Sequence, residues 1–398
     1  MLVVVGGADG YIGWPLMLHL ASRGHKVVGV DNFVTRKRVR EVGSFSGIPI
    51  ASMKRRVELA KKYLNVDITF VEGDLTDYEV VRGIFKRFEV DAFVHLGEQR
   101  SAPYSMIDVH HAVMTQTQNI ASTLNIVYAM AEMSPKTHLV KMGTMGEYGT
   151  PNIDIPEGFF EIEYKGRKDR LPFPRMASSW YHWSKVHDSG NLMFANKIWG
   201  LSITDVMQGV VYGTRTSEIT EEPLHTRFDF DEVWGTALNR FCVQTVLGLP
   251  MTVYGTGGQT RGFISLTDSI QCLRILVEKP ASDGEYRVLN QFDEPYSIKD
   301  LATKTYKVAQ KLGFNPEIRN FPNPRVESEH HYYNPIHEKL YELGYRRTRK
   351  LEAELENMLT DLDRYKDRLE SKKDVVLPRT NWRRTKNPLP AVLKLEVK

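Results

Sequence analysis

The amino-acid sequence predicts an α/β fold in which a doubly wound parallel sheet is joined to a smaller, interleaved C-terminal α/β domain. Short β-branched runs alternate with helix-like stretches through the first half of the chain. This alternation is typical of parallel strands joined by right-handed crossover helices. The 398 residues suffice for two or three domains. The alternation weakens after Val206, so we expect the second domain to begin there.

The individual elements follow from local composition. Buried strands are expected where β-branched residues cluster, at Leu2–Val5, Lys26–Val30, Ile68–Val71, Ala92–Leu96, Leu139–Met142 and Ser202–Val206. Helices are expected between them at Tyr11–Ser22, Tyr78–Phe88, Thr117–Met133 and Trp180–Lys197. An insertion at residues 36–65 includes an expected helix, Ala51–Leu64. A second insertion, residues 151–178, is rich in Pro, Gly and charge and is expected to form a flap.

The end of the chain carries a charged helix and a basic tail. We expect residues 1–205 to form the sheet domain, with added segments from about 235–270, and residues 206–398 to form mainly the second domain. Leu351–Leu369 has one apolar stripe, which favours a surface helix packed by that stripe over a partner-binding coiled coil. The stripe consists of Leu351, Leu355, Leu359 and Leu362. The last residues are expected to be a loosely ordered tail.

The composition excludes several classes of protein. Hydrophobic residues make up 41% and charged residues 26% of the chain, which excludes wholesale disorder. A net charge of +4 does not indicate nucleic-acid binding, and no apolar run approaches the roughly 18–20 residues of a membrane span. The start lacks the pattern of a secretion signal, and Cys242 and Cys272 are the only cysteines. We therefore expect a cytoplasmic protein without disulfides.

A glycine-rich turn joins the first strand to the first helix. Gly7 permits a tight turn, Gly10 permits a phosphate to approach the backbone, and Gly13 permits close packing of helix on strand. A diphosphate can then bind the amides at the helix N-terminus. This is the pattern of a Rossmann-type dinucleotide-binding domain, and we assign that role to residues 1–205.

The residues that follow the expected strands indicate which dinucleotide binds. Asp31 can accept hydrogen bonds from both adenosine ribose hydroxyls and would repel a 2′-phosphate, which favours NAD over NADP. Arg36 is the counter-signal, because it could hold a phosphate. Asp74 reaches the adenine edge, caps the next helix, or does both, and Asn119 is either a cofactor contact or a buried polar residue. The other residues expected around the cofactor are Tyr11, Ile12, Asn32, Thr35, Leu75, Leu96 and Val211.

Tyr181 and Lys185 are spaced to lie on one face of a helix. A tyrosine with its ordinary pKa of about 10 is a poor base near neutrality. A nearby ammonium favours the phenolate, so we expect Lys185 to lower the pKa of Tyr181 and also to bind the nicotinamide ribose. Thr144 follows an expected strand and would hydrogen-bond the hydroxyl that Tyr181 deprotonates. The paired histidines at 110–111 and 330–331 lack a supporting ligand pattern, so we assign no metal.

These features together resemble the extended short-chain dehydrogenase/reductase superfamily, whose members modify nucleotide sugars. Further blocks resemble one family within it, the UDP-sulfoquinovose synthases. These blocks are residues 97–106, 143–155, 208–213, 236–241, 257–262 and 322–327. The resemblance extends from Met1 to about Gly344. It implies bound NAD, a homodimer formed through the helices near 117–133 and 180–197, and the substrates UDP-glucose and sulfite.

The implied reaction oxidises the sugar at C4, removes water across C5–C6, adds sulfite at C6 and reduces C4 again. Thr144, Tyr181 and Lys185 are the expected catalytic residues. Glu147 is either the C5 base or a structural carboxylate, and His182 either acts on sulfite or the leaving hydroxyl or is a packed histidine. In sugar 4,6-dehydratases an Asp-Glu pair follows the threonine. Here residues 145–146 are Met-Gly, which leaves the acid for the 6-hydroxyl unassigned.

The UDP-sugar half of the site needs cations for the diphosphate and fixed hydrogen bonds for the uracil. Arg261 and Arg325 are the expected ligands of the UDP diphosphate, and Arg100 is expected to approach either the cofactor diphosphate or the sugar. The other expected substrate residues are Gln208, Asn239, Arg240, Tyr254, Gln259 and Glu327. Two alternatives remain: a UDP-hexose 4-epimerase or 4,6-dehydratase using the same residues, and a non-catalytic NAD-sensing protein.

Overall fold

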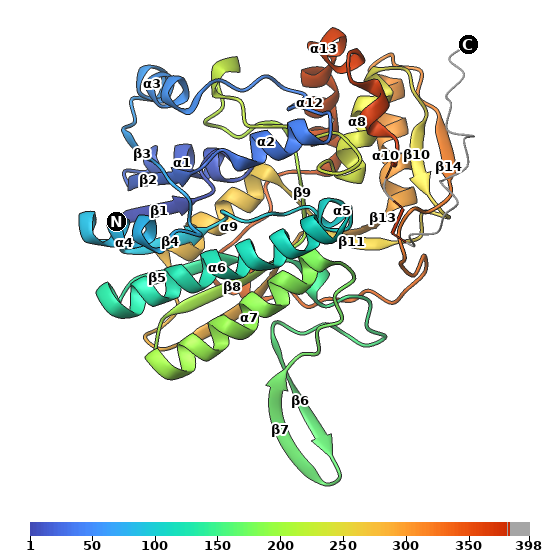
Figure 1. The fold of residues 1–398 in the computed structure, drawn as a ribbon. Coiled ribbons are helices and arrows are strands. Elements are labelled where there is room, and N and C mark those ends of the chain that lie inside the picture. Colours follow the sequence, from blue (N-terminus) through green and yellow to red (C-terminus); the bar gives the residue numbers. More distant parts are fainter. Residues whose placement is uncertain (380, 383–398) are drawn as a thin grey trace.

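The computed structural model describes residues 1–379, 381 and 382 of the chain (Figure 1). Its centre is a seven-stranded sheet with the order β12-β8-β5-β4-β1-β2-β3, in which every neighbouring pair is parallel. The strands are β1 (Leu2–Gly6), β2 (Lys26–Asp31), β3 (Ile68–Glu72), β4 (Ala92–His95), β5 (His138–Met142), β8 (Ile203–Gln208) and β12 (Tyr286–Gln291). The predicted doubly wound parallel sheet is confirmed.

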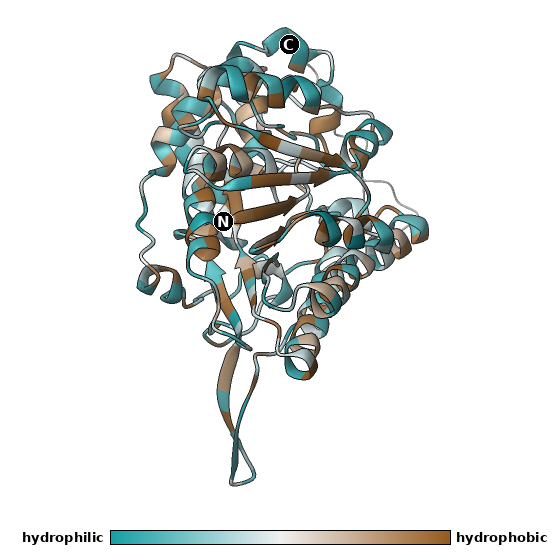
Figure 2. Ribbon diagram, turned by 90° about the vertical axis from the view of Figure 1, so that its left-hand side faces the viewer, coloured by the Kyte–Doolittle hydropathy of each residue, from teal (hydrophilic) through white to brown (hydrophobic). Residues whose placement is uncertain are grey.

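Helices cover both faces of this sheet (Figure 1). One face packs against α1 (Gly13–Ala21) and α9 (Leu266–Glu278). The other packs against α4 (Tyr78–Arg87), α6 (Val109–Met133) and α7 (Trp180–Trp199). Figure 2 shows hydrophobic strands inside and hydrophilic helix surfaces outside. This layering is expected because strands buried on both faces need apolar residues on both sides.

The sheet receives a strand from later in the chain than expected. The sequence analysis ended the sheet region near residue 205, with added segments from about 235–270. In the structure, β12 lies beside β8 and forms the sheet edge. Residues 266–291, which include α9, therefore belong to the central layers. The division of the chain into two domains stays a prediction.

The second region builds its own core from small sheets and helices. The sheets are β13-β11-β9 and the pair β10-β14. Its strands are β9 (Val210–Tyr212), β10 (Met251–Tyr254), β11 (Thr260–Ser265), β13 (Glu294–Ser297) and β14 (Ile318–Phe321). The helices in and around it are α8 (Ala237–Val246), α10 (Ile298–Lys311), α11 (Lys339–Glu342), α12 (Leu351–Asp363) and α13 (Lys366–Glu370).

The apolar stripe of α12 packs as predicted. Its four leucines are fully buried in a core shared with α8 and α10. The helix ends at Asp363 rather than continuing to 369. The predicted basic tail, apart from Asn381 and Trp382, lies outside the described residues.

Both insertions differ from expectation. The first contains α2 (Val34–Glu41), which was not predicted, and α3 (Met53–Leu64), which begins after the N-cap Ser52. The second forms a hairpin, β6 (Phe159–Tyr164) with β7 (Arg167–Pro172), that projects from the body at the bottom of Figure 1. No residue of this hairpin lines the large cavity of the molecule, but Met176 and Ser178 at the end of the same insertion do, so the flap stays a prediction.

Capping explains another shifted boundary. The helix predicted from Thr117 begins at Val109, because the Asp108 side chain accepts a hydrogen bond from the backbone N–H of His111. The short α5 (Ala102–Ser105) precedes it. Among the described residues, none of the helices is both long enough and apolar enough to cross a bilayer.

Candidate active site

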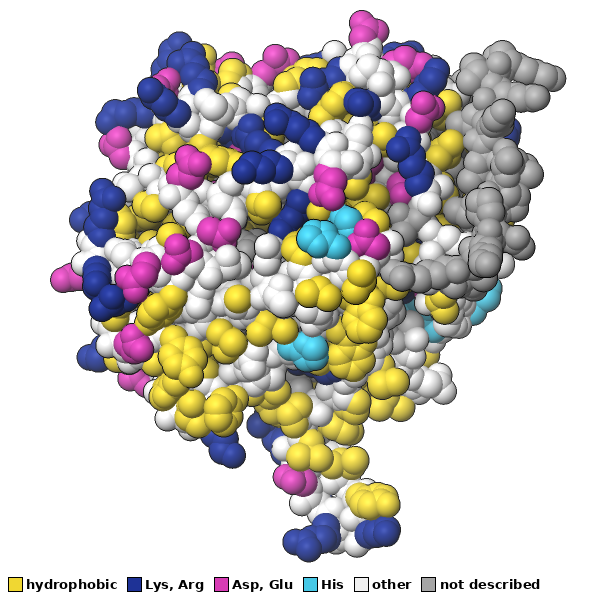
Figure 3. All heavy atoms as spheres, viewed as in Figure 1, with side chains coloured by type: hydrophobic (Ala, Val, Ile, Leu, Met, Phe, Trp, Pro, Cys, Tyr) yellow, Lys and Arg dark blue, Asp and Glu magenta, His cyan; other side chains and the backbone are white. Residues whose placement is uncertain are grey.

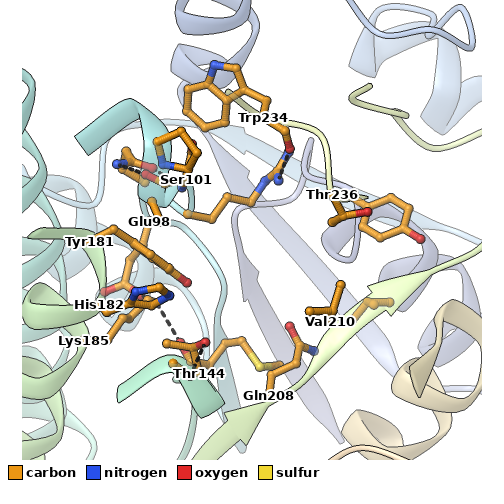
Figure 4. A pocket seen from close by; sticks show the side chains of 18 of the residues that line it. Glu98, Ser101, Thr144, Tyr181, His182, Lys185, Gln208, Val210, Trp234 and Thr236 are labelled. Carbon is orange, nitrogen blue, oxygen red and sulfur yellow. Dashed lines mark hydrogen bonds and ion pairs between the residues drawn. The ribbon is translucent and has the colours of Figure 1, made fainter. Parts of the chain in front are cut away.

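A cavity of about 750 Å³ lies at the carboxyl ends of the sheet strands, between the sheet and the second region. This is where open α/β sheets bind ligands. Residues from the loops after β1, β2, β3, β4 and β5 line one half. Residues 208–263 and 325–333 line much of the other half. Figure 4 shows Tyr181, His182 and Thr144 projecting into this space, opposite Trp234, Thr236 and Val210.

The glycine turn is built for close approach. Gly7 has φ = +84°, and a Cβ there would lie 2.7 Å from the carbonyl carbon of Leu96. A Cβ on Gly13 would lie 2.1 Å from the carbonyl oxygen of Gly7. Neither position has room for a side chain. The turn and the N-terminus of α1 line the cavity. This arrangement fits a dinucleotide diphosphate.

Asp31 is held ready for hydroxyl donors. Its two carboxylate oxygens accept hydrogen bonds from the backbone N–H groups of Asp9 and Phe33, at 2.9 and 2.7 Å. Burial raises its pKa to about 6, against the opposing effect of the Asp9 amide. Each oxygen retains a lone pair for a ribose hydroxyl. The position lines the cavity and fits NAD, as the sequence analysis predicts.

Two neighbouring predictions are corrected or refined. Arg36 does not line the cavity, because Asp9 binds its guanidinium at 2.6 and 2.7 Å and the Ala51 carbonyl accepts a further hydrogen bond. It is therefore removed from the cofactor residues. Asp74 lines the cavity and accepts hydrogen bonds from Thr76 and Asn32, but Asp77 caps the helix that follows.

Asn119 is engaged on both sides of its amide. Its oxygen accepts from the N–H of Gln99 at 2.8 Å, and its nitrogen donates to the Gln99 carbonyl and to Ser184, both at 2.9 Å. This side chain ties the loop after β4 to α7. The geometry favours the alternative of a buried polar residue, although the side chain reaches the cavity wall. Every other predicted cofactor residue lines the cavity.

Helix α7 places Tyr181 and Lys185 on the cavity side. The Ser179 hydroxyl caps the helix by accepting from the N–H of His182. The Nζ atom of Lys185 lies 5.9 Å from the centre of the Tyr181 ring. Thr144 caps the short 3₁₀ turn of residues 145–147, and its hydroxyl accepts from the N–H of Gly146 at 3.1 Å. The three predicted catalytic groups therefore face one space (Figure 4).

The pKa of Tyr181 departs from expectation. Burial raises it, Glu98 raises it further, and Lys141 lowers it. The sequence analysis expected Lys185 to lower this pKa. In the structure, Lys185 forms an ion pair with Glu98 and donates to the Met142 carbonyl at 2.7 Å. The expected lowering is wrong, because the charge of Lys185 is already compensated by a carboxylate that the sequence analysis gave no role.

Glu147 is not a base facing the cavity. It is fully buried, pairs with Arg175, and accepts from the N–H of Thr144 at 3.1 Å and from the Ser189 hydroxyl at 3.1 Å. It does not line the cavity. The structural alternative is therefore favoured. Glu147 completes a capping box that holds Thr144 in place.

His182 lines the cavity beside Gly146. One ring nitrogen, Nδ1, lies 2.9 Å from the Ser179 hydroxyl. Burial lowers its pKa to about 3, and the charges of Arg261 and Arg325 lower it further. The imidazole is therefore neutral near pH 7. A neutral ring fixed at one nitrogen can donate a hydrogen bond from the other.

The predicted UDP-sugar residues all line the cavity. Arg261 pairs with Glu327 at 2.9 Å, and Arg240 lies over the ring of Tyr254 at 4.8 Å. Arg100 pairs with Asp229 and lies over Trp234. Several arginines therefore converge on one side of the cavity. They can bind a diphosphate.

Sequence reasoning gave no role to several residues of this cavity, among them Glu98, Trp234 and Trp382. Glu98 lies within a block used for the resemblance, and a carboxylate directly after a buried strand was the available signal. Trp234 lines the cavity, and its ring centre lies 5.6 Å from the Arg100 guanidinium carbon. Trp382 lies in the tail, where its backbone N–H donates to the Pro324 carbonyl at 3.0 Å. Its ring lies 5.5 Å from the Arg325 guanidinium and lines the cavity. Nothing in the sequence marks the two tryptophans. Among the described residues, no three His, Cys, Asp or Glu side chains form a metal-binding group.

Known proteins match this chain over most of its length. The sequence model of the "NAD dependent epimerase/dehydratase family" matches residues 3–290. UDP-sulfoquinovose synthase of Sulfolobus acidocaldarius is 54% identical over 96% of this chain and 98% of its own. The chloroplastic UDP-sulfoquinovose synthase of Spinacia oleracea is 50% identical over 96% of this chain and 79% of its own.

Solved structures share the fold at lower identity. The UDP-glucose 4-epimerase of Stenotrophomonas maltophila, with bound NAD and formylated UDP-arabinopyranose, has a TM-score of 0.70 at 17% identity. The match covers 93% of this chain and 99% of that one. The sequence matches and this shared fold agree with the site geometry. The chain belongs to the UDP-sulfoquinovose synthase family, within the NAD dependent epimerase/dehydratase family.

Proposed function

We propose that this protein converts UDP-glucose and sulfite into UDP-sulfoquinovose and water, with NAD as a recycled cofactor. The observation that carries the proposal is the convergence of Tyr181, Thr144 and Lys185 on one cavity that also contains the glycine turn and Asp31. Relatives 54% and 50% identical over nearly the whole chain are UDP-sulfoquinovose synthases. The 4-epimerase, 4,6-dehydratase and NAD-sensing alternatives are not favoured.

The cofactor's place follows from the cavity. The lack of side chains at Gly7, Gly10 and Gly13 would let the diphosphate approach the backbone at the N-terminus of α1, and Asp31 would accept hydrogen bonds from the adenosine ribose. Lys185 has a third Nζ proton beyond those given to Glu98 and Met142, and with this proton it would hold the nicotinamide ribose. When bound, NAD⁺ accepts a hydride from C4 of the hexose and later returns it.

The residues of the chain handle the protons of that cycle. Tyr181 takes the O4 proton as C4 becomes a ketone, and the hydroxyl of Thr144 orients O4. The ketone acidifies the hydrogen on C5, because the resulting carbanion is an enolate. Loss of that hydrogen and of the C6 hydroxyl as water leaves a C5–C6 double bond. Tyr181 returns its proton to O4 when C4 is reduced.

Sulfite addition accounts for the remaining bond and proton of the reaction. The sulfur lone pair forms a bond to C6, and C5 regains a proton. His182 is neutral and anchored at Nδ1, so it donates a hydrogen bond to the leaving hydroxyl and then to sulfite. Arg261 and Arg325 bind the diphosphate, with Asn239 and Tyr254 beside the uridine.

The test is direct incubation. Purified protein with NAD, UDP-glucose and sulfite should give a nucleotide sugar heavier by the mass of sulfur dioxide, since water leaves as sulfite enters. Without sulfite this species should be absent. Thr144→Val should slow turnover without weakening NAD binding. Conversion to UDP-galactose, or to a 6-deoxy-4-keto sugar, with sulfite present would contradict the proposal.

A homodimer and a cytoplasmic location belong to the same proposal. Exposed apolar side chains gather on α6 and α7, including Val109 (71% exposed) and Phe194 (62%), and Figure 3 shows hydrophobic side chains over these helices. Two copies can bury this face against each other. Phe194→Glu should then shift sedimentation to the monomer, whereas Leu312→Glu, at the residue that follows α10, should not. The cytoplasmic proposal rests on two cysteines that are both free and buried.

A further inference from the structure

Four ionisable side chains form a buried cluster behind Tyr181. Glu98 comes from the loop after β4, Lys141 from β5, and Lys185 and Asp188 from α7. Their side chains are at most 5% exposed. Burying charged groups is costly unless they are paired, and burial together with the nearby Glu98 carboxylate raises the pKa of Asp188. This cluster therefore requires an explanation beyond packing.

The four groups form a chain of ion pairs. Lys185 pairs with Glu98, Lys141 lies 3.1 Å from the same carboxylate, and Asp188 accepts from Lys141 at 2.9 Å. Thr123 donates to the second oxygen of Glu98 at 3.3 Å. Glu98 is thus shared by two ammonium groups, one of which is the expected catalytic lysine. Glu98 and Lys185 line the cavity, whereas Lys141 and Asp188 stand behind them.

The electrostatic consequences fall on Tyr181. Burial and the charge of Glu98 raise the pKa of the phenol, whereas Lys141 lowers it. Although burial opposes ionisation of Glu98, Lys141 and Lys185 keep the pKa of its carboxyl low, so it is charged. Burial opposes charging of Lys141, but Asp188 and Glu98 raise its pKa. The two groups therefore act on Tyr181 with opposite signs.

Opposing effects of Glu98 and Lys141 on the phenol suit a proton that Tyr181 must both accept and return. The proposed function requires Tyr181 to take the O4 proton and to return it within one cycle. A phenol that is too acidic does not accept the proton efficiently, and one that is too basic is not ionised at the start. Lys185 alone would favour the phenolate strongly. A carboxylate on Lys185 reduces that effect, and a second lysine limits the reduction.

We propose that Glu98 is a positioning residue that sets the proton affinity of Tyr181 through its ion pair with Lys185, and that Lys141 opposes this effect of Glu98. This inference rests on the proposed function, since it gives Tyr181 the role of a proton carrier. Other titratable groups that act on the cluster or the phenol are His95 of β4, whose pKa burial lowers to about 3, Glu147 of the 3₁₀ turn and Arg100. None of these contacts the Nζ atom of Lys185 in the way Glu98 does.

The first test titrates Tyr181 in the protein alone. The ultraviolet absorbance of tyrosinate is recorded against pH, and the Tyr181→Phe curve is subtracted to isolate one phenol. Glu98→Gln should lower the midpoint by about one pH unit or more, the size expected when one close charge is removed. Lys141→Met should raise it. Asp361→Asn, which removes a buried carboxylate paired with Arg215 outside the cavity, should leave it unmoved.

The second test follows the sugar oxidation without sulfite. Reduced nicotinamide is measured after UDP-glucose is added to protein and NAD at a series of pH values. The acid limb of this pH profile should shift to lower pH in Glu98→Gln and to higher pH in Lys141→Met. The inference would be overturned if neither variant shifted the tyrosinate midpoint or the acid limb of the pH profile, and only the amount of reduced nicotinamide fell. The proposed function would still stand in that case. Wild-type protein that binds UDP-glucose yet reduces no nicotinamide would instead overturn the proposed function. If Glu98→Gln does not fold, the upward shift in Lys141→Met decides.

Discussion

Asp31 offers a prediction whose size follows from the structure. Its pKa rises from 3.8 to about 6 on folding, chiefly through burial. The folded carboxyl therefore keeps its proton to higher pH than the unfolded one does. Ionising the buried carboxyl lowers the free energy of unfolding. This free-energy cost is absent below the unfolded pKa and is complete above the folded pKa. At about 1.4 kcal/mol per unit, it reaches about 3 kcal/mol at neutral pH.

Asp31→Asn removes this titration. The amide loses one of two hydrogen bonds to backbone N–H groups, but that loss does not depend on pH. The free energy of unfolding of the wild type, minus that of the variant, should therefore fall by about 1.5 kcal/mol from pH 5 to pH 7.5. Urea unfolding curves of both proteins at several pH values measure it. A difference that is constant, or that rises with pH, would refute the reasoning.

Three further predictions concern catalysis, the glycine turn and the core. Tyr181→Phe should abolish turnover of UDP-glucose and sulfite while NAD affinity, measured by calorimetry, stays within a few-fold of wild type; retained turnover would remove Tyr181 as the proton carrier. Gly13→Ala should abolish NAD binding, because its Cβ would lie 2.1 Å from a carbonyl oxygen, whereas Gly190→Ala meets nothing within 4 Å and should bind normally. Leu355→Ala on α12 should lower the free energy of unfolding by about 2–5 kcal/mol, and Leu312→Ala, which is 41% exposed, by far less; equal losses would place the α12 stripe outside the core.

The central sheet could be predicted because its strands are buried on both faces. Runs such as Leu2–Gly6 are almost wholly β-branched or apolar, so their composition identifies them. The edge strand β12 ends in two adjacent polar residues, the buried Asn290 and Gln291. Its polar side chains are satisfied by partners distant in sequence, such as the Ile336 carbonyl bound by Asn290. No local pattern reveals such partners.

The candidate site shows the same division. The glycine turn and the Tyr181/Lys185 pair are local motifs, and the structure brings them to one cavity. Arg36 and Glu147 are bound by Asp9 and Arg175, which lie on other segments of the chain. A charged side chain close to a motif does not disclose its partner. For that reason the sequence also gave no indication that a carboxylate compensates the charge of Lys185.

The central claim is that the hexose is oxidised at C4 by hydride transfer while Tyr181 carries the O4 proton. The most direct measurement mixes the NAD-loaded protein with UDP-glucose bearing hydrogen or deuterium at C4 and follows the absorbance of reduced nicotinamide. The account predicts a rapid rise that is slower with deuterium, and a final sulfonated sugar that retains the deuterium at C4. Sulfonated product formed with no rise, or with solvent hydrogen at C4, would contradict it.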